Sequence, residues 1–214
     1  MTWGGPGSAV VEVEVNEATM ARIREALDRY GMLPAHDPVV PSVTNLVAGR
    51  PIRGSWWGDP AGRQIYLVLN ALAPEVAWPK LLGGKVTLVH RRLWPALAAV
   101  GEQDADWQTA DLGQVERDAL VVVRERGEVS SDDLGVPAGT KPGKVVTELE
   151  RRLLVIADQE HTEGGHHARN VRTWRRWLDG ERPGVDEAAA SLEAAAEALG
   201  ARSWLPWMPP EVVE

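Results

Sequence analysis

The sequence predicts an α+β fold that is mainly helical and carries short β-hairpins. Most segments place apolar residues at every third or fourth position, which is the period of an amphipathic helix. Two segments instead carry β-prone residues on both sides of a glycine-containing turn, at Gly83-Gly84 and at Thr162–Gly165. In each half of the chain helices come first, then the hairpin, then a helix start rich in Arg and Trp. The sequence therefore predicts one architecture used twice.

Composition limits the class of protein. The chain has 214 residues, of which 44% are hydrophobic, enough to bury the core of one or two small domains. No apolar run approaches the ~18 residues of a membrane helix, and the N-terminus lacks the layout of a signal peptide. We therefore expect no membrane association and a cytoplasmic location. The absence of cysteine excludes disulfides, cysteine nucleophiles and thiolate metal sites.

The first fifty residues predict a strand and two helices. Residues 9–15 alternate valine with polar or small residues, as a strand with one wet face does. Asn16 is a good N-cap for a helix through residue 30, which Gly31 would end. Ser42 can cap a second, shorter helix that ends at Gly49. The proline-rich stretch between them predicts a loop.

Residues 50–60 form the most unusual local stretch. Trp56 and Trp57 stand side by side among Gly and Pro, so we expect one ring to pack and the other to stay partly exposed. In a functional interpretation, Arg53 contacts a phosphate and the two rings stack on an unpaired base. In the structural alternative, both rings fasten a long loop to the core, which is the commoner use of Trp.

The rest of the first half predicts a helix, a hairpin and another helix. Residues 62–72 have a helical apolar period. Residues 76–82 and 85–90 are apolar and β-branched on either side of Gly83-Gly84, a turn that tight hairpins prefer. Residues 91–100 then return to a helical period.

The second half predicts three helices, the first two of them with recognisable caps. Asp111 and Gln114 can form a capping box for a helix that Gly127 ends. Ser130 can cap a short second helix that carries Leu134.

A third helix, a hairpin and a C-terminal helix follow. The third helix is predicted from Thr140 to Leu153, and residues 153–156 and 166–171 are predicted as the strands of the hairpin. Residues 185–199 are rich in Ala and Glu and predict a further helix. The Trp- and Pro-rich tail from Trp204 is apolar, so we expect it to pack back across the body or against a partner.

Three short helices followed by a hairpin is the order of a winged helix-turn-helix, in which the third helix enters a DNA groove and the hairpin is the wing. The sequence thus predicts tandem winged helix-turn-helix domains. We expect an N-terminal winged-helix-like domain at 1–101, a second winged-helix domain at 102–180, and a C-terminal helix with its tail at 181–214.

Six segments carry a resemblance to a known family. They are Arg53–Trp57, Lys85–Pro95, Glu128–Leu134, Val145–Leu154, His161–Glu163 and Arg172–Trp174. Together they resemble the winged-helix repeats of the AlkZ/YcaQ group of bacterial proteins, in particular its uncharacterised relatives. The resemblance implies a bacterial DNA-binding protein with a relation to DNA repair.

The glycosylases of that group use two glutamines one residue apart, or a close variant, to position the attacking water. The glutamines of this chain are Gln64, Gln103, Gln108, Gln114 and Gln159, and no two have that spacing. The resemblance therefore does not carry the glycosylase activity over to this chain.

Charge is distributed unevenly along the chain. The net charge of −8 argues against a simple nucleic-acid-binding protein. However, residues 50–95 carry seven basic against two acidic residues, and residues 139–177 carry eight against five. Residues 96–138 have three basic against ten acidic residues, and residues 178–214 two against eight. Either the two basic islands mark DNA contacts, or exposed helix faces alternate in sign by chance.

The candidate DNA contacts lie in these two basic islands. In the first island they are Arg53, Trp56, Trp57, Lys85, His90, Arg91 and Arg92. In the second island they are Lys141, Lys144, Arg151, Arg152, Arg169 and Arg172. A histidine such as His90 is more often structural than catalytic.

The second hairpin also contains groups that can bind a metal. His161, Glu163 and His167 have imidazole and carboxylate groups suited to Zn²⁺ or Ni²⁺. His166 and His167 point to opposite faces of a strand, so at most one of them joins His161. Because this is no recognised ligand spacing, we expect neither a metal site nor a cofactor.

Three functions are open on sequence grounds. DNA binding by tandem winged helices is the leading hypothesis. An interaction or regulatory scaffold is the alternative, with a protein partner or self-association through the C-terminal tail. A DNA base hydrolase is the third, and it needs a pocket in which an acidic side chain meets Arg53, Lys85 or His90.

Overall fold

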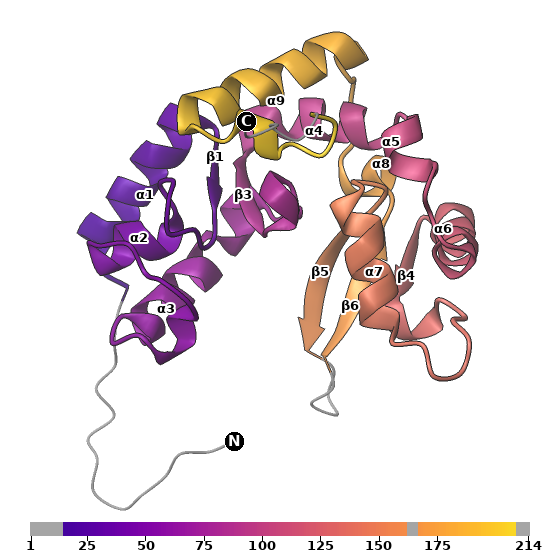
Figure 1. Ribbon diagram of the computed structural model, residues 1–214, viewed down its shortest axis with the longest axis horizontal. Coiled ribbons are helices and arrows are strands. Elements are labelled where there is room, and N and C mark those ends of the chain that lie inside the picture. The colour runs from indigo at the N-terminus through magenta and orange to yellow at the C-terminus, as the bar shows by residue number, and fades with distance from the viewer. Residues whose placement is uncertain (1–14, 162–166, 209–214) are drawn as a thin grey trace, which may run out of the picture.

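The computed structural model describes residues 15–161 and 167–208. Within these ranges the chain combines helices with two three-stranded antiparallel sheets, which confirms the α+β class (Figure 1). No helix in the described part is both long enough and apolar enough to cross a membrane. The strand predicted for residues 9–15 falls almost wholly outside the described residues.

The first unit is built from three helices and the sheet β1-β3-β2. Its elements are α1 (Glu17–Tyr30), β1 (Met32–Pro34), α2 (Val43–Ala48), α3 (Gly62–Leu72), β2 (Val76–Ala77) and β3 (Thr87–His90). The predicted caps are confirmed: the Asn16 side chain accepts from the backbone N–H of Thr19 at 3.1 Å, and Gly31 closes α1 with a φ of 79°. Ser42 caps α2 in the same way through Asn45 N–H.

The first hairpin turns at Gly83-Gly84 as predicted, but its connection is longer than two residues and its strands are shorter. Gly83 and Gly84 both have positive φ, 59° and 69°, and Lys85 N donates to Leu82 O at 3.0 Å. The register places Val76 opposite His90 and Lys80 opposite Val86, whereas a two-residue loop would place Leu82 opposite Lys85. The first strand was predicted to run from residue 76 to 82, but β2 covers only Val76–Ala77. Pro79 lies in this run and lacks the N–H that a ladder needs. Beyond it, pairing continues only as an isolated bridge between Lys80 and Val86.

The second unit repeats the order of the first. Its elements are α5 (Asp106–Thr109), α6 (Gln114–Arg126), β4 (Glu128–Ser130), α7 (Pro142–Arg151), β5 (Ile156–His161) and β6 (His167–Arg172). Helix, strand, short helical turn, helix, strand and strand follow one another as in the first unit. The sheet order β4-β6-β5 also matches β1-β3-β2 position by position.

Three local predictions for the second unit were wrong. The capping box of Asp111 and Gln114 does not form, because α6 begins at Gln114 with Gly113 as its N-cap and leaves Asp111 outside. The Gln114 side chain instead donates from Nε2 to Asp118 at 2.8 Å. The second helix is a single 3-10 turn, Ser131–Asp133, cut short by the Gly and Pro residues that follow. The first hairpin strand begins at Ile156, not at residue 153.

The C-terminal part of the described chain covers the first unit. After α8 (Trp174–Trp177), α9 (Val185–Leu199) lies across the top of the molecule and packs on α1 and on α4 (Trp94–Gly101) (Figure 1). Four of its apolar side chains are buried there: Ala188, Leu192, Ala196 and Leu199. Helix α9 therefore completes the core of the first unit.

The described part of the tail, up to Met208, also packs on the body. Leu205 is buried, and the Trp207 ring lies 5.7 Å from that of Trp107. The Trp207 Nε1–H donates to Glu193 of α9 at 3.1 Å. Of the two arrangements expected for the tail, this part adopts the intramolecular one.

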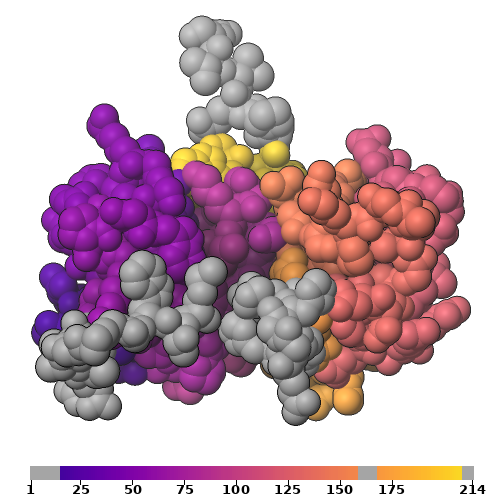
Figure 2. Space-filling view, turned by 90° about the horizontal axis from the view of Figure 1, so that it is seen from below, coloured from indigo at the N-terminus to yellow at the C-terminus, as the bar shows by residue number. Residues whose placement is uncertain are grey.

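The two units meet along a narrow junction, and Figure 2 shows them on opposite sides of the molecule, the first in indigo and purple and the second in orange. The Trp174 indole is 1% exposed and lies against the backbone of Gly101, at the end of α4. Lys80 Nζ approaches Glu150 of α7 at 3.9 Å. The Arg151 side chain covers Gly84, where an added Cβ would lie 3.3 Å from Nε.

We expect Gly101→Ala to destabilise the protein by roughly 1–3 kcal/mol, the usual cost of overpacking a core. An added Cβ at this position would overlap the buried Trp174 ring, which the fold leaves little room to move. Urea unfolding measures the loss. Gly143→Ala in α7 is the matched control, because its Cβ meets no described atom within 4 Å; this variant should be neutral or up to ~1 kcal/mol more stable. Equal stability of the two variants would contradict the packing described for Gly101.

Candidate nucleic-acid interface

Helix α7 has an apolar inner side and a basic outer side. Val145, Val146 and Leu149 are buried. Lys141, at the N-cap, and Lys144 are exposed, and neither forms an ion pair with any residue that the structure describes. Pro142 at the first helical position fits this start, because its missing N–H would have no partner there.

Arg151 extends the basic side of α7 to the end of the helix. Its side chain is exposed and has no ion pair within the described ranges, although it also covers Gly84 at the junction. Lys144 and Arg151 lie seven residues apart, two helical turns, and so share one face. Glu148 lies between them, but its carboxylate is paired with Arg152 at 2.7 Å.

A hollow of about 600 Å³ separates this helix from the start of α6. Its lining is mixed: Asp111, Gly113 and Glu116 come from the α6 side, and Gly143, Lys144, Thr147, Glu148 and Arg151 come from α7. The positive charge therefore lies on the α7 ridge and not throughout the hollow.

Three other predicted contacts are engaged within the second unit. Arg152 pairs with Glu148, Arg169 with the buried Glu150, and Arg172 with Asp158. Half of the six basic residues proposed for this island are thus neutralised, and Lys141, Lys144 and Arg151 are those without an ion-pair partner among the described residues.

Glu150 was missed as a site residue by sequence reasoning. It is 2% exposed, accepts a hydrogen bond from Arg169 and faces Lys80 of the first unit. Burial lowers the pKa of Lys80, and the Glu150 carboxylate opposes that shift. The only sequence signal for this buried role was the position of Glu150 beside Leu149 on the apolar side of α7.

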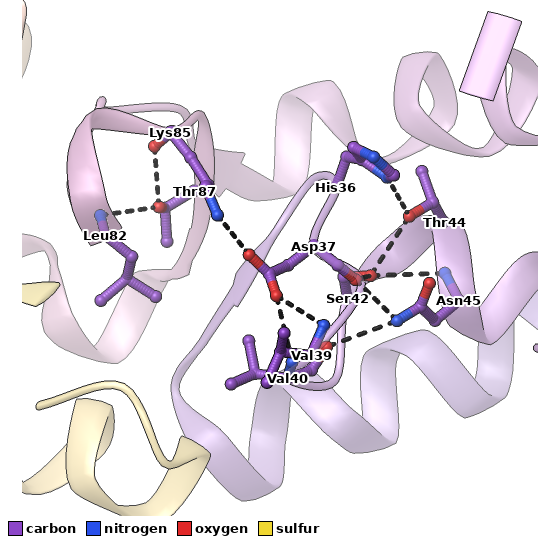
Figure 3. Close-up of polar contacts among 10 residues, drawn as sticks. All are labelled: His36, Asp37, Val39, Val40, Ser42, Thr44, Asn45, Leu82, Lys85 and Thr87. Atoms are coloured by element: carbon purple, nitrogen blue, oxygen red, sulfur yellow. Dashed lines mark hydrogen bonds and ion pairs between the residues drawn. The ribbon is translucent and has the colours of Figure 1, made fainter. Parts of the chain in front are cut away.

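Lys85, a predicted contact of the first unit, is occupied by internal partners (Figure 3). Its Nζ lies 2.5 Å from Asp37 Oδ2 and 4.9 Å from the centre of the Trp204 ring. The other oxygen of Asp37 accepts the backbone N–H groups of Val39 and Val40 at 2.8 and 3.1 Å. Lys85 therefore fixes the loop after β1, and its charge is already balanced.

Asp37 has a perturbed pKa. Burial raises the pKa of this carboxyl, but the hydrogen bonds from Lys85, Val39 and Val40 outweigh burial, so the net pKa is lower than usual. The sequence predicts only a loop for this stretch. An Asp that accepts from the amides two and three residues later is a recognised turn pattern and was the available signal.

His90 has a structural role at the end of β3. Its Nδ1 accepts from Arg92 N at 3.3 Å, and its Nε2 lies 3.1 Å from Asp28 Oδ1. Burial lowers the pKa of His90, and Asp28 acts in the opposite direction. Arg92 itself donates to the Asp28 carbonyl, whereas Arg91 is exposed and forms no ion pair with any described residue.

His90 and Asp28 also line a hollow of about 480 Å³ between α1 and the end of the first sheet. An acidic side chain thus meets His90, as the hydrolase hypothesis requires. Arg24 and Glu75 in the same hollow form a two-pronged ion pair at 2.7 and 2.9 Å. Because both ring nitrogens of His90 are engaged, the ring has no free nitrogen to act as a base.

The loop with Trp56 and Trp57 does not fasten itself to the core. The two rings stack on each other with their centres 4.1 Å apart, and Trp57 is 67% exposed. Neither belongs to a core cluster. The structural alternative, in which both rings pack inward, is therefore wrong. Arg53 is exposed nearby in the sequence and has no ion pair in the described part of the chain.

The candidate metal ligands of the second hairpin lie partly outside the described residues. His161 and His167 are opposite each other in the β5–β6 register. Glu163 and His166 lie outside the described residues. Within the ranges 15–161 and 167–208, no group of three or more His, Cys, Asp or Glu is arranged to hold a metal ion.

Comparisons of the chain with protein-family models, with curated proteins and with solved structures found no match. The fold and its surface define an α+β protein with two repeated three-stranded units, one of which presents on α7 a basic ridge without ion pairs to other described residues.

We expect Asp37→Asn to cost roughly 1–3 kcal/mol of stability at neutral pH, because it leaves Lys85 without its charged partner. Since the folded pKa of Asp37 is lowered, its contribution is fully present above the unfolded pKa of about 3.9 and is lost as pH falls through the folded pKa. The difference between wild type and variant should therefore shrink below about pH 4. Urea unfolding at neutral and acidic pH measures it.

The control for that variant is Asp111→Asn, an exposed carboxylate with no ion pair among the described residues. It should change stability by no more than about 0.5 kcal/mol at either pH. A deficit of Asp37→Asn that stayed the same size in acid would refute the role assigned to the Asp37 charge.

Proposed function

We propose that this chain is a bacterial DNA-binding protein with tandem winged helix-turn-helix units, related to the AlkZ/YcaQ group. Two features of the fold support the proposal. Both units follow the order helix, strand, helix or helical turn, helix, strand and strand. In both, the last strand lies between the other two, as in β1-β3-β2 and β4-β6-β5. The strand pair after each third helix corresponds to the wing of that motif.

The observation that carries the proposal is the outer side of α7. This third helix of the second unit presents Lys141, Lys144 and Arg151 without ion pairs among the described residues, directly before the β5–β6 hairpin. A winged helix places its third helix in the major groove, where free Lys and Arg side chains contact phosphates and bases.

The net charge of −8 does not oppose this assignment as strongly as its size suggests. Eighteen of the acidic residues lie in 96–138 and 178–214, outside the two basic islands of the sequence, and of these Asp111 and Glu116 line the hollow beside Lys144 and Arg151. At physiological salt the Debye length is about 8 Å, so exposed carboxylates farther away act weakly on a phosphate bound at α7.

The proposal is limited to binding. No two glutamines have the spacing of the glycosylase pair. Gln108 has a structural role: it is fully buried, accepts from Ala105 N and donates to Arg152 O, both at 3.0 Å. A role in DNA repair would follow from the resemblance and not from any catalytic group identified here.

We expect Lys141→Ala/Lys144→Ala to weaken binding of a labelled duplex on the order of tenfold at low salt, because two phosphate contacts are lost. The slope of log affinity against log salt should fall by about two units. Fluorescence anisotropy across a salt titration measures both quantities.

Arg126→Ala/Arg175→Ala is the charge-matched control, since both residues are exposed, unpaired among the described residues and on other helices, α6 and α8. It should bind duplex DNA as the wild type does. Absence of any duplex binding at about 50 mM salt, where phosphate contacts dominate, would sink the proposal and favour a protein-interaction module. Equal loss in both double variants would show only a general charge effect.

A further inference from the structure

Three aromatic side chains form an exposed cluster on the first unit. They are Trp56 and Trp57 of the 3-10 turn Trp56–Gly58 and Tyr66 of α3, and we name them the aromatic platform. Trp57 is 67% exposed and Tyr66 is 45% exposed. Large apolar side chains are rarely this exposed in groups unless they contact a ligand or partner.

The rings of the platform are stacked and largely exposed to solvent. Trp56 and Trp57 are nearly parallel, with 22° between their planes and 4.1 Å between their centres. Tyr66 flanks Trp57 at 6.0 Å with a tilt of 42°. A further flat ring can extend such a stack, since offset stacking is a favoured arrangement for aromatic groups.

The backbone beneath the rings is held in place before any ligand binds. Asp59 accepts from Ala61 N at 2.9 Å and pairs with Arg50 at 2.6 Å. Gly62 N donates to Asp59 O at 2.8 Å. Gly62 also packs so closely that a Cβ there would lie 2.9 Å from the Trp56 carbonyl oxygen. A preorganised site loses less entropy on binding.

Core packing does not account for these rings. Neither tryptophan nor Tyr66 belongs to the two core clusters or to the partly buried residues packed on them. By contrast, Ile65 and Val68 of the same helix α3 are completely buried. The aromatic residues therefore lie on the side of α3 that faces solvent.

The charges around the platform indicate the kind of ligand. Arg53 and Arg63 are exposed, and neither has an ion pair within the described chain. Asp59 is the only acidic residue between positions 50 and 66, and Arg50 neutralises it. Flat rings beside uncompensated positive charge suit a flat ring carried on a negatively charged backbone, which is a nucleotide in a single strand.

We infer that the aromatic platform stacks on an unpaired base of DNA, so that the protein binds a duplex with a single-stranded extension more tightly than a blunt duplex. The inference rests on the proposed function for the duplex contact, which belongs to α7. The platform lies at the start of α3, the third helix of the first unit, and α7 is the third helix of the second unit (Figure 1). The two contacts therefore lie on different units of one molecule.

The test is anisotropy with three DNAs: a blunt duplex, the same duplex with a short single-stranded extension, and that extension with abasic sites. Wild type should prefer the extension, and abasic sites should remove the gain although every phosphate remains. Trp57→Ala should weaken binding of the extended DNA roughly 5- to 150-fold, the effect of losing one or more stacked bases. Its binding of blunt duplex should stay within about twofold of wild type.

Two further variants make the result specific to stacking. Trp57→Phe keeps an aromatic face and should retain most of the preference. Val39→Ala removes another apolar side chain, 80% exposed on a different loop, and should have no effect. Urea unfolding should give the same midpoint for wild type and Trp57→Ala, because the ring is exposed.

The outcomes separate the inference from the proposed function. If wild type binds blunt, extended and abasic DNA equally, the inference is overturned while duplex binding by α7 stands. If Trp57→Ala weakens blunt and extended DNA equally, the platform contacts duplex and the inference is likewise overturned. A proline-rich peptide that binds wild type but not Trp57→Ala, with no gain from the extension, would assign the platform to a peptide instead. Absence of binding to all three DNAs would remove both proposals.

Discussion

The arrangement of the two units depends on the burial of Trp174. This ring follows β6 and is held between the end of α7 and the backbone of Gly101 in α4. Its Nε1–H donates to the Leu153 carbonyl. Leu153 has a φ of 52°, a left-handed conformation that costs a branched residue roughly 1–2 kcal/mol, so the surrounding contacts must compensate for it. The Trp177 ring extends this contact, with its centre 5.7 Å from that of Trp174. The Trp94 ring in turn lies 5.1 Å from Trp177.

Folding also limits which basic residues can bind an external anion. Guanidinium groups are held against carboxylates, either from another element, as in Arg169 with Glu150, or from the preceding helical turn, as in Arg152 with Glu148. Lys85 forms an ion pair with Asp37, 48 residues away in the sequence. Among the described residues, charge is left for an external anion on α7 and around the platform, and also at scattered exposed arginines such as Arg91, Arg126 and Arg175. A count of Lys and Arg along the chain therefore overestimates that charge.

Local patterns predicted the helices and turns well. Asn16 and Gly31 mark the ends of α1 because capping depends only on neighbours in the chain. The same holds for Gly83-Gly84 in the first hairpin and for α9, whose Ala and Glu favour helix without outside help. In these segments the stabilising interactions join residues close in sequence, so the local sequence is sufficient to predict them.

Features that depend on distant partners could not be predicted. Strand β4 is only three residues long and is defined by its pairing with β6, some forty residues later. The sequence predicts part of the candidate site, namely Lys141, Lys144, Arg53 and the Trp pair. These side chains are exposed, so their availability does not depend on a contact with a distant part of the chain. The roles of Asp37, Glu150 and Tyr66 were missed, since each is set by a contact that only the folded chain creates.

The turn at Gly83-Gly84 shows that a duplicated architecture need not duplicate a surface. In the first unit this turn lies under Arg151, and the neighbouring Lys80 faces Glu150, so the β2–β3 hairpin serves as a spacer between the units. The corresponding β5–β6 hairpin runs toward the lower edge of the molecule (Figure 1). The β2–β3 hairpin thus forms part of the contact between the two units. Substitutions in this hairpin would therefore act on the contact between the two units.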